Sequence, residues 1–140
     1  MIRFDPVLVH RWLSRTAERV PEKTALIAGE RRLSYAEIDE LSDRCAWALA
    51  EVGVGRGDRV VVLLNNSIET VIAAYGILKA GAVSVILEGS VKGRKLAYVI
   101  DNADLKGLIT TDRIEEHVNF VERLSKAFPD LASSADPRAL

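Results

Sequence analysis

Three glycines at alternate positions, Gly53, Gly55 and Gly57, are the residues of this sequence whose spacing resembles a phosphate-binding turn. Such glycines bind a dinucleotide when a strand precedes them and a helix follows, because the helix N-terminus then meets the pyrophosphate. Here a helical pattern comes first and an apolar strand pattern follows. The segment therefore predicts a helix cap and a turn, and we discount nucleotide binding there.

A second type of phosphate site is a run of Gly, Ser and Thr with a Lys, whose backbone amides and cation meet the phosphate oxygens. The nearest candidates are Thr110-Thr111 and Ser133-Ser134. Neither pair has a glycine or a lysine in the required place. We therefore find no phosphate-binding loop in these 140 residues.

The reactive side chains give no pattern for nucleophilic or metal-dependent catalysis. Cys45 falls on the apolar side of a predicted helix and fits a small core residue. His10 and His117 fall on the first and last predicted helices without a companion at metal-ligand spacing. Glu115 and Glu116 are adjacent on one helix and point in different directions, which predicts a solvated face. We therefore predict no catalytic, cofactor-binding or metal-binding residue.

Asn65-Asn66-Ser67 is the one segment whose position favours a ligand site. It follows an apolar strand pattern and so lies at the carboxyl edge of a predicted sheet, where open α/β folds bind ligands. The simpler interpretation is that the segment ends the strand and that Ser67 caps the next helix. Both interpretations stay open at this point, and the cap is the favoured one.

Short apolar runs alternate with helical patterns along most of the chain. Such strands are typical of a parallel sheet that is covered on both faces and joined by right-handed crossovers. We therefore predict a three-layer α/β fold with a mostly parallel sheet, preceded by a short N-terminal hairpin around Gly29-Glu30. The predicted parallel strands are residues 59–64, 82–87 and 106–110, and the predicted helices are residues 5–19, 35–52, 68–80, 94–102 and 113–127.

The clearest local signal is a capping box formed by Ser34 and Glu37, with Leu33 and Ile38 at the two staple positions. It predicts that a helix begins at Tyr35. The predicted buried side of that helix contains Tyr35, Ile38, Leu41, Cys45, Leu49 and Val52, and Gly53 follows as its cap.

Length and composition predict one domain, residues 1–129, and a disordered tail, residues 130–140. With 19 basic and 20 acidic residues, the net charge of -1 provides no field for nucleic acid or an anionic membrane. The single cysteine excludes an internal disulfide, and no apolar run reaches the length of a signal peptide or a membrane span. We therefore expect a cytoplasmic protein that binds neither nucleic acid nor a membrane.

Residues 33–38, 53–60 and 78–85 together resemble the opening of the AMP-dependent synthetase and ligase family, the adenylate-forming acyl-CoA synthetases. The resemblance runs from about Pro21 to about Asp112. Members of that family activate a carboxylic acid with ATP as an acyl-adenylate and pass the acyl group to a thiol, usually that of coenzyme A. The resemblance implies ATP, Mg²⁺ and coenzyme A for a complete enzyme and none of them for this chain alone.

The family's phosphate loop lies downstream of all the residues present here. The resemblance therefore implies a truncated N-terminal fragment of an acid–thiol ligase, a partial domain that acts as a scaffold and is not competent alone. One departure is Val85-Ile86-Leu87-Glu88-Gly89, where the family usually has two prolines; their loss predicts a softer exit loop. The alternative is a stand-alone module that reuses this scaffold to bind a small ligand or another protein.

Trp47 lies about 200° round its predicted helix from Cys45, on the side away from the core. An indole in that position would normally be covered by another part of the protein. We therefore predict an exposed apolar patch near Trp47 that drives self-association or binds the remaining synthetase domains.

Overall fold

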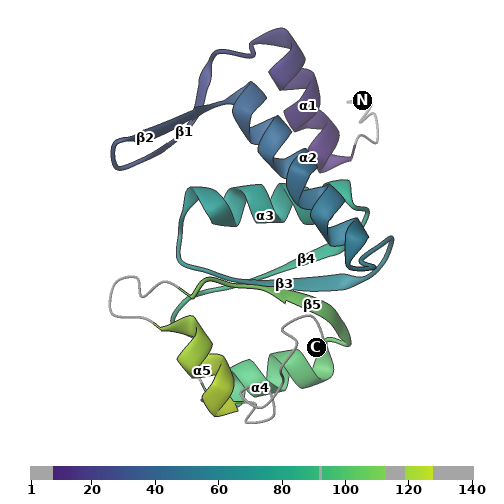
Figure 1. The fold of residues 1–140 in the computed structure, drawn as a ribbon, viewed down its shortest axis with the longest axis vertical. Coiled ribbons are helices and arrows are strands. Elements are labelled where there is room, and N and C mark those ends of the chain that lie inside the picture. Colours follow the sequence, from purple (N-terminus) through teal and green to yellow (C-terminus); the bar gives the residue numbers. More distant parts are fainter. Residues whose placement is uncertain (1–7, 92, 113–118, 128–140) are drawn as a thin grey trace, which may run out of the picture.

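The computed structural model describes residues 8–91, 93–112 and 119–127, which form five helices and five strands. In chain order the elements are α1 (Val9–Arg19), β1 (Thr24–Ala28), β2 (Arg31–Ser34), α2 (Tyr35–Glu51), β3 (Arg59–Leu63), α3 (Ile68–Lys79), β4 (Val83–Leu87), α4 (Gly93–Asn102), β5 (Leu105–Ile109) and α5 (Phe120–Ala127). β3 pairs in parallel with β4 on one side and with β5 on the other. Figure 1 shows helices on both faces of this sheet, so the predicted α/β fold is confirmed.

In the strand order β4-β3-β5, the two crossover connections run across the sheet in opposite directions. The chain leaves β3 for β4 on one side, and then crosses β3 to reach β5 on the other. Because crossovers between parallel strands are almost always right-handed, the helices of the two crossovers are expected on opposite faces of the sheet. In Figure 1, α3 accordingly lies on one face, and α4 lies with α5 on the other.

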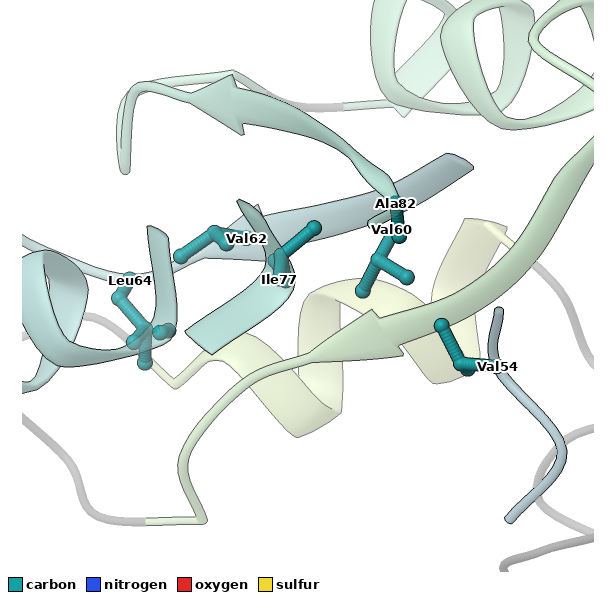
Figure 2. Packing of buried hydrophobic residues seen from close by; sticks show 7 residues of the cluster. Val54, Val60, Val62, Leu64, Ile77 and Ala82 are labelled. Carbon is teal, nitrogen blue, oxygen red and sulfur yellow. The ribbon is translucent and has the colours of Figure 1, made fainter. Parts of the chain in front are cut away.

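The central strand β3 supplies both hydrophobic cores, since successive side chains of a strand point to opposite faces. All four residues from Val60 to Leu63 are fully buried. The core between the sheet and α3, shown in Figure 2, contains Val54, Val60, Val62, Leu64, Ala73, Ile77 and Ala82. The core on the α4 and α5 side contains Val61, Leu63, Val91, Leu96, Phe120 and Leu124.

A third cluster lies beyond α3, where α1, α2 and the hairpin cover its outer side (Figure 1). Its buried members are Leu13, Leu33, Ile38 and Ile68. The helix α3 is therefore packed on two sides, against the sheet and against this outer layer. Its buried residues are Ile68, Ala73, Gly76 and Ile77.

The start of α2 follows the sequence prediction closely. Ser34 Oγ accepts a hydrogen bond from the Glu37 backbone amide at 3.3 Å, and Glu37 Oε2 accepts one from the Ser34 amide at 2.7 Å. The capping box is therefore confirmed, as is the left-handed Gly53 cap, with φ of 83°.

The predicted buried side of α2 was wrong at its C-terminal end. Val52 lies just past the helix and is 58% exposed, whereas Ser42, which the prediction omitted, is fully buried. Ser42 lies where α2 comes close to α3, since a Cβ added at Gly76 would be 3.2 Å from the Ser42 carbonyl oxygen. Its hydroxyl donates to the Asp39 carbonyl at 2.9 Å, so burial leaves it bonded.

The hairpin is confirmed, with β1 and β2 antiparallel and Gly29 in a left-handed turn at φ of 60°. Two predicted helix starts fall on residues that the structure does not describe. α1 begins at Val9, and the predicted start around residues 5 and 6 lies outside the described residues. α5 begins at Phe120 because the Asn119 side chain accepts from the Glu122 amide at 2.9 Å, capping the helix there.

Several predictions fall on residues that the structure does not describe. These are the first part of the last predicted helix, residues 113–118, and the predicted tail, residues 130–140. The boundaries of a single domain over residues 1–129 therefore stay a prediction. None of the described helices combines the length and the apolar character needed to cross a membrane.

Candidate functional site

The carboxyl edge of the parallel sheet is the candidate site that the fold provides. Chain segments leave β3, β4 and β5 at this edge, at residues 64–67, 88–90 and 110–112. The segment after β3 turns to the α3 face, whereas those after β4 and β5 lead to the opposite face. A reversal of this kind between neighbouring strands is where open α/β sheets usually bind ligands.

The segment after β3 is occupied by hydrogen bonds that start α3. Ser67 is the N-cap, and its hydroxyl accepts from the Thr70 backbone amide at 3.3 Å. The Thr70 hydroxyl donates in turn to the Asn65 carbonyl at 2.6 Å. The favoured interpretation of Asn65-Asn66-Ser67, a strand end and a helix cap, is therefore confirmed.

The segment after β4 is packed tightly at Gly89. A Cβ atom added there would clash with Asn65 Oδ1 and would lie 3.2 Å from Cζ of Phe120. The Arg123 guanidinium donates to the Gly89 carbonyl and lies 5.8 Å from the centre of the Phe120 ring. The sequence predicted a soft loop here, but these contacts hold the exit of β4 between β3 and α5.

No local sequence signal could have identified the Gly89 packing, because its partners lie more than twenty residues away on either side. The exit of β5 is tied to β3 in a similar way, since the Thr110 hydroxyl donates to the Leu63 carbonyl at 2.9 Å. Thr110 was weighed above as part of a phosphate loop. Its side chain instead links two neighbouring strands.

Among the residues that the structure describes, the exposed polar ones at this edge are Asn66, Glu88, Ser90 and Asp112. The Ser90 hydroxyl lies 3.2 Å from Glu88 Oε2, within hydrogen-bond distance. These groups can form hydrogen bonds, but they include no lysine or arginine to offset a phosphate and no histidine to move a proton. Within the described ranges, no three side chains come together that could hold a metal ion.

The other candidates lie away from this edge. Cys45 packs on Gly76 between α2 and α3, and burial raises the pKa of its thiol. His10 lies on α1, where burial, followed by the nearby charges of Arg11 and Lys79, lowers the pKa of its imidazole. Gly57 adopts a left-handed conformation, with φ of 87°, in the turn before β3. The structure brings none of these residues together.

His117, Glu115, Glu116 and Ser133-Ser134 lie outside the described residues. The described part of the chain contains neither a lysine-bearing glycine loop nor a cluster of side chains that could hold a metal ion. The absence of catalytic and cofactor-binding residues from the whole sequence stays a prediction.

Among the ion pairs of the described residues, the least exposed side chain is that of Lys79, at 7%. Its ammonium donates to the Asp39 carboxylate at 2.6 Å and to the Asp43 carboxylate at 2.7 Å. Ser14 donates to the same Asp39 carboxylate at 2.8 Å. These contacts join α1, α2 and α3, and their geometry is that of a structural clamp.

A weaker ion pair joins the hairpin to α3. Arg31 lies 2.7 Å from Glu69, and its hydrogen bond is the main cause that lowers the pKa of the Glu69 carboxyl. Both side chains are more than half exposed. Exposed pairs of this kind contribute little to stability.

Fold and site thus define an α/β scaffold whose polar side chains mainly form hydrogen bonds and ion pairs within the scaffold. The sequence pattern that defines the AMP-binding enzymes matches residues 13–138. The chain therefore belongs to the family of AMP-binding enzymes. The matching members are acyl-CoA ligases and adenylation enzymes, and the chain corresponds to their N-terminal portion.

The chain is 35% identical over 113 residues to the medium/long-chain-fatty-acid–CoA/3-oxocholest-4-en-26-oate–CoA ligase of Mycobacterium marinum, covering 81% of this chain and 20% of the ligase. It is 30% identical over 115 residues to tyrocidine synthase 2 of Brevibacillus parabrevis, covering 82% of this chain and 3% of the synthase. The inhibitor-bound N-terminal domain of FACL13 from Mycobacterium tuberculosis superimposes with a TM-score of 0.73 and 25% identity, over 92% of this chain and 30% of that one.

These matches confirm the resemblance seen in the sequence and the assignment to an N-terminal ligase portion. The chain spans about a fifth of the length of the mycobacterial ligase. The acyl-CoA ligases of this family use ATP, Mg²⁺ and coenzyme A. No comparison supports the alternative of a stand-alone binding module.

Proposed function

We propose that these residues form the N-terminal scaffold of an acyl-adenylating acid–thiol ligase and are not catalytic alone. The observation that carries this proposal is the family match over residues 13–138 in a sequence without a lysine-bearing glycine loop. A scaffold role also agrees with the carboxyl edge, where Ser67, Thr70 and Thr110 bond to the backbone nearby.

In this proposal the active site is completed by the remaining ligase domains, whether they belong to the same polypeptide or to another. ATP, Mg²⁺ and coenzyme A would bind to the completed enzyme, and its substrate would be a carboxylic acid. We place the protein in the cytoplasm, where ATP and coenzyme A are available.

The first test is ATP–pyrophosphate exchange by the purified chain with a panel of carboxylic acids. We expect no exchange above a heat-killed control, while a complete relative assayed in parallel is active. Acid-dependent exchange by this chain, in protein free of host synthetases, would show that the residues are catalytic by themselves.

The second test is a chimera in which this chain replaces the matching fifth of the mycobacterial ligase. A scaffold role predicts that the folded chimera still forms acyl-adenylate. A matched chimera with Gly76→Leu should lose soluble protein, because that side chain would collide with Cys45. A well-folded chimera with the native segment but no adenylation would contradict the proposal.

A further inference from the structure

The outer face of α1 combines apolar and basic side chains. Trp12 is 58% exposed, and the Arg15 guanidinium lies 6.0 Å from the centre of its ring. Arg11 and Arg19 are also exposed, and one acid, Glu18, lies among them. We call the surface formed by Leu8, Arg11, Trp12, Arg15 and Arg19 the basic face.

The outer face of α2 has the opposite charge. Trp47 is 74% exposed, more than any other large apolar residue that the structure describes. Asp43 and Glu51 are exposed four residues before and after it, Glu40 is exposed seven residues before it on the same side of the helix, and Arg44 is the basic residue among them. We call the surface formed by Glu40, Asp43, Trp47 and Glu51 the acidic face.

The two faces belong to one rigid layer, because α1 and α2 lie side by side beyond α3 (Figure 1). Lys79 reaches between the helices and bonds Asp39 and Asp43, and Ser14 bonds Asp39 from α1. The helices that carry the two oppositely charged faces are therefore held in a fixed arrangement, although the whole chain has a net charge of only -1.

We propose that a second copy of this chain docks on this layer in a two-fold arrangement, with the basic face of each copy against the acidic face of the other. A two-fold contact is self-complementary, so one pair of faces satisfies both halves of the interface. The pairing also covers Trp12 and Trp47, whose indoles are otherwise exposed to water. This inference concerns assembly and does not depend on the proposed ligase role.

The size of the layer sets the expected strength. Helices of these lengths extend over about 16 and 25 Å and are each about 10 Å wide. The layer is therefore smaller than a standard stable interface, which buries about 800 Å² on each partner. We expect a weak dimer with a micromolar dissociation constant that is weakened by salt, because the charges lie at the rim of the contact.

The experiment is sedimentation over a concentration series at low and high salt, with two charge-reversed variants. One variant carries Arg11→Glu and Arg15→Glu, so both of its faces are acidic. The other carries Glu40→Arg and Glu51→Arg, so both of its faces are basic. We expect each variant alone to be monomeric, and an equimolar mixture to form a heterodimer, because both contacts are then attractive again.

A matched control carries Lys95→Glu and Lys106→Glu, exposed charges outside the layer that change the net charge by the same amount as the first variant. It should dimerise like the native chain. Trp47→Ser should raise the dissociation constant about tenfold, whereas Tyr98→Ser, at the 67% exposed residue of α4, should leave it unchanged.

Circular dichroism and thermal melting establish that each variant is folded. A native chain that stays monomeric at all concentrations would overturn the proposal. So would variants that dimerise normally, or folded variants whose mixture stays monomeric. A monomer that instead binds anionic phospholipid vesicles through Arg11 and Arg15 would assign the basic face to a membrane and would equally overturn it.

Discussion

The two faces of the sheet are packed in different ways. On one face α3 is buried between the sheet and a second layer made of α1, α2 and the hairpin (Figure 1). On the other face α4 and α5 form a single layer, and Tyr98 and Val121 on their outer sides are exposed. On the first face, α3 is therefore buried on two sides. On the second face, α4 and α5 are each buried on one side.

This difference is reflected in the side chains at each contact. The α2–α3 contact uses small residues, Ser42, Cys45 and Gly76, because two helices can only approach closely where side chains are short. The α5 contact uses one large side chain, Phe120, which is fully buried against the sheet. We therefore expect the first contact to be sensitive to added volume and the second to lost volume.

The largest effect is expected for Phe120→Ala on the single-layer face. Loss of a fully buried phenylalanine should lower the free energy of unfolding by about 3–5 kcal/mol, because the ring leaves a cavity beside Gly89 and Leu96. Urea denaturation followed by circular dichroism measures the change. Val121→Ala, at an exposed neighbour in the same helix, is the control and should cost less than about 1 kcal/mol. Equal effects of the two substitutions would mean that Phe120 is not packed as described.

A smaller effect is expected when volume is added between α2 and α3. A Cβ at Gly76 would lie 2.6 Å from both Cβ and Sγ of Cys45, so Gly76→Ala should destabilise the protein by about 1–3 kcal/mol. Adding Cys45→Gly should recover part of that loss, since it removes both clashing atoms. A double-mutant cycle gives the coupling free energy between the two sites.

The control for this pair is Gly107→Ala on β5, where a Cβ would meet nothing within 4 Å. It should change stability by less than about 1 kcal/mol. Additive effects of Gly76→Ala and Cys45→Gly would show that the two helices do not meet at these residues.

Local chemistry explains which parts of the fold could be predicted from the sequence. The Ser34 cap, the Gly53 turn and the strand periodicity depend on neighbouring residues, and the structure agrees with each of them. The burial of Ser42 and the tight packing of Gly89 depend on contacts between distant segments, and neither was predicted. At the carboxyl edge the sequence indicated the helix cap at Ser67 but not the links from Thr110 to Leu63 and from Arg123 to Gly89.

The smallest of these effects tests whether the second layer unfolds together with the sheet. Ser34→Ala removes the α2 cap and its reciprocal bond with Glu37, and should destabilise the protein by about 0.5–2 kcal/mol. Because Lys79 joins α3 to Asp39 and Asp43 of α2, the loss should reach the sheet as well as the outer layer.

Native-state hydrogen exchange can show whether the second layer unfolds together with the sheet or opens by itself, because it reports the opening free energy of each region. If the layers are coupled, protection should fall by the same amount for amides of α2 and of β3. Ser90→Ala, an exposed serine after β4, is the matched control and should change neither. A fall confined to α1, α2 and the hairpin would show that the second layer opens independently. Each face of the sheet would then unfold together with one helical layer only, α3 on one face and α4 with α5 on the other. The two faces would be more alike in their unfolding than in their packing.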